Sequence, residues 1–254
     1  MRKRAIMNTL FIGQCSERLN SVGSTNAYLK QMQQKNQLPE GFTVVAKHQI
    51  SGRGQFGNRW IDEDGKNLLI SVLLRPSFLP ARHSFVLSMS ACLALHDFFE
   101  RYCQQVQIKW PNDILIDQKK VAGLLIENQI AGNNLQSSIL GMGLNINQQK
   151  AATPQASSLL NILGTSVDLA LAEKQLLEML EKRYLQLRSA HDFKAVKNEY
   201  LSKLYGYRQQ IVVMENQEQR KASINDVTYE GFLDLQNPDN TSAKYAFKEI
   251  SFVL

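Results

Sequence analysis

Apolar residues recur along the chain at two spacings, and the spacing separates predicted helices from predicted strands. Residues 85–102 carry apolar side chains three and four positions apart, which predicts a helix packed in a core. Further amphipathic patterns predict helices at residues 27–34, 169–187 and 193–204. Ser24 or Thr25 precedes the first helix, where a hydroxyl can accept a hydrogen bond from an early N–H group.

Strands are predicted where apolar residues alternate or run continuously, at residues 42–49, 67–74, 106–110, 114–116, 121–129 and 137–144. The run from 67 to 74 is almost wholly apolar, which implies burial on both faces. Residues 51–66 hold four glycines among polar side chains and predict a loop. Residues 131–134 predict a turn between the last two strands.

After Gly206 the pattern changes to short, evenly spaced β segments. They cover residues 211–214, 221–227, 231–235, 243–247 and 250–253. Five short strands in so few residues indicate a small barrel. We therefore expect two domains, residues 1–205 and residues 206–254.

The composition indicates which kinds of molecule the chain could bind. The chain has 254 residues, 44% of them hydrophobic, a formal charge of +6 and a pI of about 9.2. This charge favours anionic partners such as nucleotides, phosphates, acidic proteins or nucleic acid, and does not choose among them. The three cysteines form no close pair, which favours a reducing compartment. The four histidines lack metal-ligand spacing, which argues against a protein-bound zinc ion.

The N-terminus resembles a signal peptide only superficially. Basic residues 1–4 precede an apolar stretch, but Asn8 and Thr9 interrupt it and no small-residue cleavage site follows. No later segment approaches the length of a membrane helix. We expect a cytoplasmic protein without membrane association.

The first chemically suggestive segment is glycine-rich and runs from Gln49 to Trp60. Its glycines allow backbone N–H groups to approach an anion closely, and Arg53 stands between Gly52 and Gly54. A guanidinium so placed suits a phosphate or a carboxylate. The same glycine pattern equally fits a flexible surface loop, with Trp60 in the core.

The second segment, residues 109–127, is the most informative part of the chain. It reads Lys-Trp-Pro-Asn-Asp at its start, continues through Lys120 and Gly123, and ends at Glu127. Such a density of charge beside a buried-type tryptophan suits a site that neutralises phosphate next to an apolar ligand. Asp113 could hold magnesium or act as a base. The alternative is a strand hairpin whose neighbouring lysines, Lys119 and Lys120, are both solvated.

Two weaker motifs complete the set. Gly141 and Gly143 sit at the end of a predicted strand, where a ligand could approach closely, and Asn145 would share their face if the strand continued. Glycines at strand ends more often mark turns. Residues 24–26 read Ser-Thr-Asn, whose hydroxyls could bind a polar ligand, although a plain helix cap explains them equally well.

Together, in this order and spacing, the four motifs resemble those of the biotin–protein ligases. The resemblance covers nearly the whole chain, and the Lys-Trp-Pro-Asn-Asp block is its most specific part. It implies an α+β fold, with a mixed-sheet catalytic domain of the biotin/lipoate ligase type followed by an SH3-like β-barrel. It also implies ATP and Mg²⁺ as cofactors, biotin as substrate, and a biotin carboxyl carrier domain of a carboxylase as partner.

The resemblance assigns roles to residues by position. Biotin is expected to contact Ser24, Thr25, Gln49, Gly52, Arg53, Trp60, Lys120, Gly123 and Gly141. ATP is expected to contact Arg53, Gln55, Trp60, Lys109, Asn112, Asp113, Lys120 and Asn145. Catalysis is assigned to Lys120, Arg53, Asp113 and Lys109, with Lys120 bridging the biotin carboxylate and the α-phosphate. Asp113 is the expected magnesium ligand.

The chain departs from the family pattern at two places. Gln55 stands where a second basic residue is common, so the positive field is expected to be weaker there. The tail lacks the late arginine of some members, which leaves its contact with ATP open. Only 23 residues precede Ser24, too few for a helix-turn-helix domain, so we expect no DNA binding.

Two alternatives remain, and the oligomeric state stays open between monomer and homodimer. A lipoate–protein ligase would want a different glycine-rich block containing a histidine. A nucleic-acid module would place clustered Lys and Arg between exposed aromatics on its strands.

Overall fold

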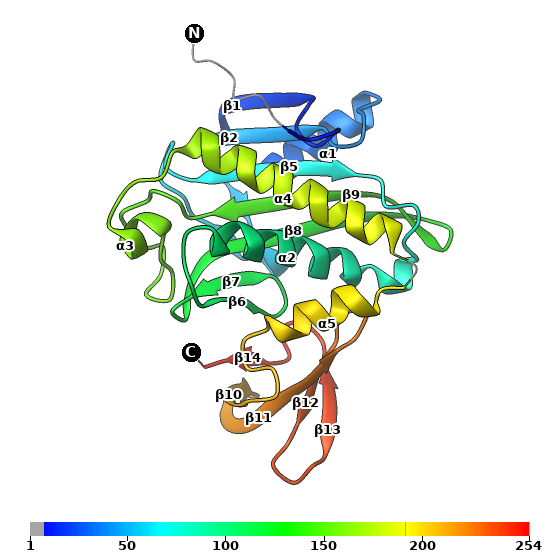
Figure 1. Ribbon diagram of the computed structural model, residues 1–254, viewed down its shortest axis with the longest axis vertical. Helices are drawn as coiled ribbons and strands as arrows, with labels where there is room; N and C mark the ends of the chain where they lie inside the picture. The colour runs from blue at the N-terminus through cyan, green and yellow to red at the C-terminus, as the bar shows by residue number, and fades with distance from the viewer. Residues whose placement is uncertain (1–7, 191, 254) are drawn as a thin grey trace.

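The computed structural model describes residues 8–190 and 192–253, and a seven-stranded sheet forms its larger part (Figure 1). In spatial order the strands are β1 (Ser16–Val22), β2 (Thr43–Gln49), β5 (Leu68–Leu74), β9 (Asn134–Leu144), β8 (Lys119–Ala131), β7 (Asp113–Ile116) and β6 (Val106–Lys109). β1 and β2 run parallel, and the remaining neighbours pair antiparallel. The sheet is therefore mixed, and the predicted α+β class is confirmed.

Helices cover both faces of this sheet because its central strands are apolar on both sides. Alternate residues of β5, among them Ile70 and Val72, join the main core with α2 (Phe85–Glu100) and α4 (Leu169–Ser189). Leu73 points the other way and packs with Leu29 of α1 (Thr25–Lys35). Hence α1 lies on the face opposite to α2 and α4.

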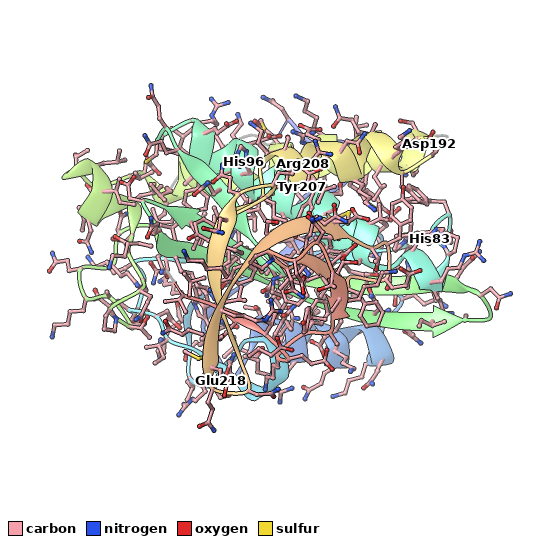
Figure 2. The ribbon with its side chains drawn as sticks, turned by 90° about the horizontal axis from the view of Figure 1, so that it is seen from below. His83, His96, Asp192, Tyr207, Arg208 and Glu218 are labelled. Atoms are coloured by element: carbon pink, nitrogen blue, oxygen red, sulfur yellow. The ribbon has the colours of Figure 1, made fainter. Side chains whose placement is uncertain are left out.

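The C-terminal part is a separate five-stranded sheet, attached through α5 (Lys194–Ser202). Its strands are, in spatial order, β13 (Ser242–Tyr245), β12 (Leu233–Gln236), β11 (Glu218–Val227), β10 (Gln210–Glu215) and β14 (Ser251–Phe252). All of its neighbouring pairs are antiparallel. Seen from below in Figure 2, these strands lie across the larger part of the molecule, and Tyr207 lines a common pocket with His96.

Trp110 fastens the two sheets together. Its indole Nε1 donates to the carbonyl of Gly231 at 3.0 Å, and its ring lies 5.1 Å from that of Phe247. Gly231 has a φ of 101°, and a Cβ there would come within 2.8 Å of Phe85. The tryptophan of the Lys-Trp-Pro-Asn-Asp motif is thus 3% exposed and holds the two domains in contact.

Most predicted elements are confirmed within a few residues, and the misses have physical causes. β1 was not predicted because its sequence, Ser-Glu-Arg-Leu-Asn-Ser-Val, lacks apolar alternation at an edge that is largely exposed. A second omission is α3 (Leu159–Leu163), which is too short for a periodic pattern. The loop prediction for residues 51–66 is wrong in part. A small hairpin of β3 (Gly52–Arg53) and β4 (Arg59–Trp60) enclosing η1 (Gln55–Gly57) forms there.

The N-cap prediction is right in position and wrong in its hydrogen bond. Ser24 occupies the cap with extended backbone, but its side chain makes no capping bond. Predictions made for residues 1–7 fall outside the described residues. None of the helices in the described part of the chain combines the length and the apolar character needed to cross a bilayer.

Replacing Trp110 should loosen the contact between the two sheets. We expect Trp110→Ala to lower the free energy of unfolding by about 3–5 kcal/mol, because a large buried ring is lost. Trp110→Phe keeps one aromatic ring against Phe247 and removes the bond to Gly231 with part of the ring volume, so a smaller loss of about 1–3 kcal/mol is expected. Urea denaturation measures both. Equal losses in the two variants would show that ring packing contributes nothing.

Candidate active site

A cleft of about 480 Å³ opens on the α1 face of the sheet and reaches the C-terminal domain. Most of the residues that the motifs singled out line it, namely Ser24, Thr25, Gln49, Arg53, Gln55, Trp60, Lys109, Asn112, Asp113, Lys120, Gly123 and Gly141. Four segments far apart in the sequence therefore meet at one place. The tip of the C-terminal sheet closes one end through residues 247–252.

Glycines form the floor of the cleft. Gly123 of β8 and Gly143 of β9 are direct partners in the sheet, and the Trp60 ring lies over both. A Cβ on Gly143 would stand 2.5 Å from the ring, and one on Gly123 would stand 3.2 Å away. The indole Nε1 of Trp60 is buried without a hydrogen-bond partner among the described residues. The floor thus admits a flat group directly against the strand backbones.

One end of the cleft is uncharged and polar. The carboxamide oxygen of Gln49 accepts from the backbone N–H of Thr25 at 2.8 Å and lies 3.1 Å from the Thr25 hydroxyl. Because this oxygen faces α1, the amide nitrogen of Gln49 is left as a donor. Asn26, which the motif analysis did not assign to the site, also lines this end.

The other end is charged. Lys120 Nζ lies 2.6 Å from Asp113 Oδ1 and 5.7 Å from the centre of the Trp60 ring. Lys109 stands over the Phe252 ring at 5.8 Å. Burial lowers the pKa of Lys109, Asp113 opposes this effect, and Lys120 adds to it. Two ammonium groups thus share one carboxylate in a partly desolvated place.

The turn that carries this charge is tightly held. The Trp110–Pro111 peptide bond is cis, and the Asn112 side-chain amide donates to the carbonyl of Leu124 on β8. The backbone N–H of Leu124 returns a bond to the carbonyl of Asn112 at 3.0 Å. Asn112 therefore anchors the turn to the floor strand.

The two neighbouring lysines have different surroundings. Lys120 faces the cleft, whereas Lys119 is exposed and donates to the carbonyl of Pro154 at 2.8 Å. The alternative of a solvated pair is therefore right for Lys119 and wrong for Lys120. Strand alternation separates them. The local pattern of two adjacent lysines did not show which of them faces inward, and only the family resemblance assigned Lys120 to the site.

Two cations of the cleft were missed by the motif analysis. Arg59 belongs to the same hairpin as Gln55, and Lys248 comes from the turn before β14. Among the described lining residues there is one carboxylate, Asp113, against five cationic side chains: Arg53, Arg59, Lys109, Lys120 and Lys248. The positive field was expected to be weaker at Gln55, but Arg59 of the same hairpin adds a positive charge to the cleft. For Arg59, the sequence signal that could have found it was its place in the same glycine-rich segment as Arg53.

Two predicted residues lie outside the described lining. A Cβ on Gly52 would stand 2.7 Å from the carbonyl of Trp60, so this glycine lets the β3–β4 hairpin close. Asn145 is 3% exposed and donates to the carbonyl of Ser157 at 3.0 Å. Asn145 follows the end of β9 at Leu144, and its expected contact with ATP stays a prediction.

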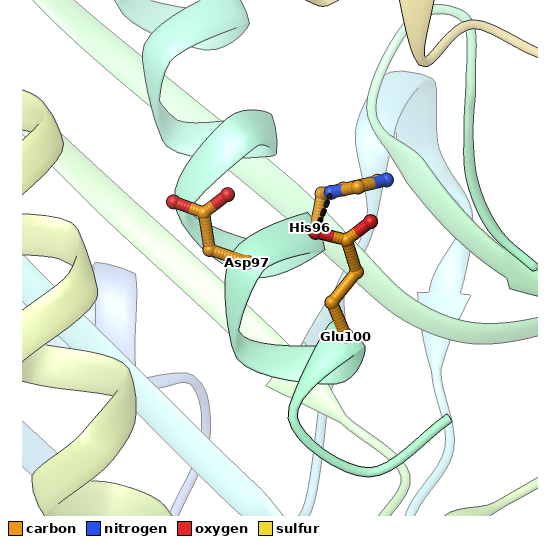
Figure 3. Close-up of side chains that lie close together, drawn as sticks. All are labelled: His96, Asp97 and Glu100. Atoms are coloured by element: carbon orange, nitrogen blue, oxygen red, sulfur yellow. Dashed lines mark ion pairs between the residues drawn. The ribbon is translucent and has the colours of Figure 1, made fainter. Parts of the chain in front are cut away.

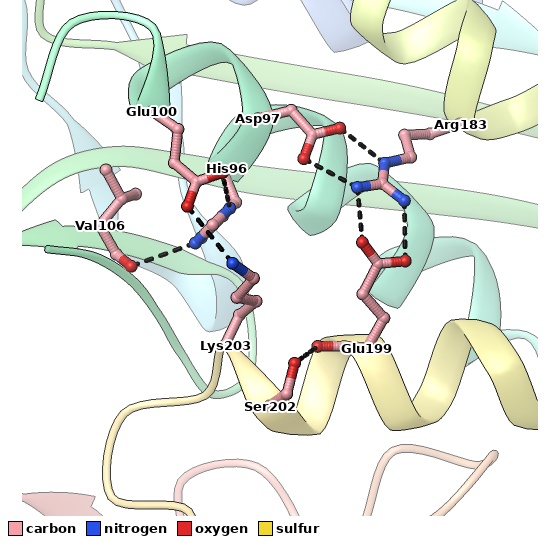
Figure 4. A network of polar contacts seen from close by, with 8 residues as sticks. All are labelled: His96, Asp97, Glu100, Val106, Arg183, Glu199, Ser202 and Lys203. Carbon is pink, nitrogen blue, oxygen red and sulfur yellow. Dashed lines mark hydrogen bonds and ion pairs between the residues drawn. The ribbon is translucent and has the colours of Figure 1, made fainter. Parts of the chain in front are cut away.

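Outside the cleft, three side chains lie close enough together to be considered as metal ligands. His96, Asp97 and Glu100 cluster at the end of α2 (Figure 3). Both carboxylate oxygens of Asp97 are bound by Arg183, and Glu100 lies 3.3 Å from Lys203 Nζ (Figure 4). Cationic side chains already neutralise these carboxylates, so the geometry is that of a structural ion-pair network between α2, α4 and α5.

Comparison with known proteins agrees with this geometry. Residues 19–145, half of the chain, match the model of the Biotin/lipoate A/B protein ligase family. The Bifunctional ligase/repressor BirA of Bacillus subtilis is 36% identical over 168 residues, which are 64% of this chain and 51% of that protein. The chain therefore corresponds to about half the length of that relative. The Biotin–[acetyl-CoA-carboxylase] ligase of Mycobacterium tuberculosis is 33% identical, over 66% of this chain and 64% of that protein.

A solved structure shares the whole architecture. The biotin protein ligase from Aquifex aeolicus in complex with biotin and ATP superimposes with a TM-score of 0.74 and 23% identity, over 94% of this chain and 98% of that one. The likeness confirms the predicted fold, with the five-stranded C-terminal sheet as its SH3-like part.

Adding a methyl group to the floor should displace Trp60 more where less space is available. We expect Gly143→Ala to shift the Trp60 emission to longer wavelength, because the ring must leave the strands and meet solvent. Gly123→Ala, with 3.2 Å rather than 2.5 Å available, should shift it less. Intrinsic fluorescence measures this, with Trp60→Phe giving the contribution of Trp110. Identical spectra for both variants and the native protein would contradict the packing described.

Proposed function

Because this chain belongs to the Biotin/lipoate A/B protein ligase family, we propose that it is an ATP-dependent biotin–protein ligase. In the proposed reaction a biotin carboxylate oxygen attacks the α-phosphorus of ATP. The bond from that phosphorus to the bridging oxygen of the β-phosphate breaks, and pyrophosphate leaves. A lysine amine of a carrier domain then attacks the carbonyl carbon of biotinyl-5′-AMP, forming an amide and releasing AMP.

The observation that carries this proposal is the distribution of charge in the cleft. A carboxylate and a triphosphate repel each other, so they meet only where fixed cations offset their charge. Lys120 belongs to the charged end and lies 5.7 Å from the centre of the Trp60 ring, so its ammonium group is placed to meet both a carboxylate on the floor and an α-phosphate. Its ion pair with Asp113 holds the ammonium group in place before substrates arrive, so little reorganisation accompanies the reaction.

Position and exclusion of water would supply the rest of the rate enhancement. The glycine floor and Trp60 offer an apolar slot for the biotin ring, while Gln49 offers an amide donor at its polar end. Arg53 and Arg59 belong to the β3–β4 hairpin, which borders the cleft. Closure of that hairpin over the adenylate would protect the mixed anhydride from hydrolysis.

The donor set fits a magnesium ion that accompanies the nucleotide. Asp113 is the one carboxylate among the described lining residues, and two lysines stand beside it, so the protein by itself offers too few oxygens for a dedicated site. Asp113 would offer one oxygen to an ion whose other ligands are phosphate oxygens and water. Bound there, the ion would neutralise charge on the leaving pyrophosphate.

The acceptor in this proposal is a biotin carboxyl carrier domain of a carboxylase, and residues 206–254 act as a second domain that borders the nucleotide end. Cytoplasmic location is supported by three cysteines that are free thiols, Cys15, Cys92 and Cys103. Burial raises the pKa of Cys92 strongly, which keeps that thiol unreactive.

Biotin-dependent exchange between pyrophosphate and ATP tests the first step, and the two adjacent lysines provide a matched pair. We expect Lys120→Ala to reduce the exchange rate by about 100-fold or more, because a charge at the reacting centre is lost. Lys119→Ala should stay within about twofold of native, because Lys119 contacts only a loop carbonyl.

Each arm of this experiment can reject the proposal. Native protein that exchanges pyrophosphate with lipoate but not with biotin would move the assignment to lipoate ligation. Equal losses in both lysine variants would remove the special role of Lys120. Absence of exchange with either acid would reject adenylate formation altogether.

The lowered pKa of Lys109 predicts how nucleotide affinity depends on pH. Below that pKa the ammonium attracts the triphosphate, and as pH rises through it the charge is lost earlier than for an ordinary lysine. The KM for ATP should therefore rise with pH in the native protein below the range where an ordinary lysine titrates. Lys109→Arg stays charged over this range, so its KM should stay nearly level. Parallel profiles would show that Lys109 does not contact the nucleotide.

A further inference from the structure

Glu127 lies just behind the polar end of the cleft. It follows Gly123 and Leu125 by strand alternation on β8, so its side chain points to the α1 face of the sheet. Its Oε2 accepts from Asn26 Nδ2 at 2.9 Å, and its Oε1 lies 3.6 Å from Lys30 Nζ. The carboxylate opens onto a groove between α1 and the β8–β9 hairpin rather than onto the cleft.

Glu127 sets the orientation of the Asn26 carboxamide. Asn26 Nδ2 faces two groups that can only accept, the Glu127 carboxylate and the carbonyl of Leu125 at 3.3 Å. Asn26 Oδ1 accepts from the Ser71 hydroxyl at 2.6 Å. A flipped amide would bring its oxygen against both acceptors, so one orientation is allowed. Gly141 lies directly against this amide and has no room for a Cβ.

A chain of contacts links the orientation of Asn26 to Gln49, which lines the cleft. Ser71 Oγ, which donates to Asn26, also lies 2.7 Å from Thr25 Oγ1. Thr25 in turn holds the carboxamide oxygen of Gln49 through its backbone N–H at 2.8 Å. All four side chains are buried, and none is more than 9% exposed. A change at Asn26 therefore reaches Gln49 through direct contacts.

We propose that Glu127 is a positioning residue for the bound acid: it orients Asn26 and, through Ser71 and Thr25, the Gln49 amide, without touching the ligand. The proposal rests on the biotin ligase function proposed above. The network joins β2, β5, α1 and the later part of β8, whereas Lys109, Asp113 and Lys120 lie on β6, on β7 and at the start of β8. Glu127 should therefore govern affinity for biotin and leave affinity for ATP and the chemical step unchanged.

Kinetics of the pyrophosphate exchange reaction test whether Glu127 affects biotin binding separately from ATP binding and the chemical step. We expect Glu127→Ala to raise the KM for biotin about tenfold, because Asn26 loses its strongest acceptor, while kcat and the KM for ATP change less than about twofold. Gln129→Ala, on the same face of β8 and beyond the network, should match the native protein. Lys30→Met removes the ion pair and keeps the bond to Asn26, so it should also match the native protein.

Swapping the amide and the carboxylate between Asn26 and Glu127 tests the hydrogen bond that joins them. Asn26→Asp places a second carboxylate against Glu127, so biotin affinity should fall about 100-fold at neutral pH and recover in part below about pH 6, where the pair takes up a proton. Adding Glu127→Gln restores a donor and an acceptor with their places exchanged. The double variant should bind biotin at least about tenfold more tightly than Asn26→Asp alone and lose the recovery at low pH.

The outcomes separate this inference from the function on which it depends. If native protein neither binds biotin in calorimetry nor supports exchange, the proposed function fails. If native protein binds biotin and Glu127→Ala binds it equally well, or the double variant is no better than Asn26→Asp, only the positioning role fails. A Glu127→Ala protein that loses biotin and ATP binding together, with a lowered unfolding temperature, would show a structural role and overturn the proposal.

Discussion

The cleft depends on the alternation of side chains along β5, β8 and β9. One set of positions on these strands is large and apolar and packs against α2 and α4. The other set carries Ser71, Gly123, Gly141 and Gly143, which are small enough for a ligand to approach the backbone. A one-residue shift in register would bury the glycines and expose the core, so the same pairing that stabilises the sheet creates the floor.

Charge in the cleft follows from bringing cations together without enough carboxylates to neutralise them. Asp113 pairs with Lys120 and also faces Lys109, and further cations come from the β3–β4 hairpin and the C-terminal domain. Like charges in a partly desolvated place raise the free energy of the empty protein. Burial lowers the pKa of Lys109, with a smaller contribution from Lys120, and the proposed adenylation chemistry would bring anionic substrates that offset both effects.

The motif residues were predictable because each motif combines local backbone requirements with side-chain chemistry. Each of these features is visible within its own short segment: the glycines beside Arg53, the proline turn before Asp113 and the paired glycines of β9. Residues that enter the cleft from outside these motifs were not predictable. Lys248 lies in an ordinary turn. Contacts between motifs were not predictable either, since the bond from Asn26 to Glu127 joins residues 101 positions apart. The surroundings of Asn145 were also not predictable, because its backbone bonds join it to Val121 and Leu159 in other segments.

By itself the sequence determined most helices and strands, the change of pattern after Gly206 and the motif residues, because periodicity and turn chemistry act over a few residues. Only the tertiary structure decided that Lys120 rather than Lys119 faces the cleft, that Trp60 lies on a pair of glycines, and that Trp110 joins the two domains. These contacts depend on strand register and on the docking of distant segments, which local residue preferences do not specify.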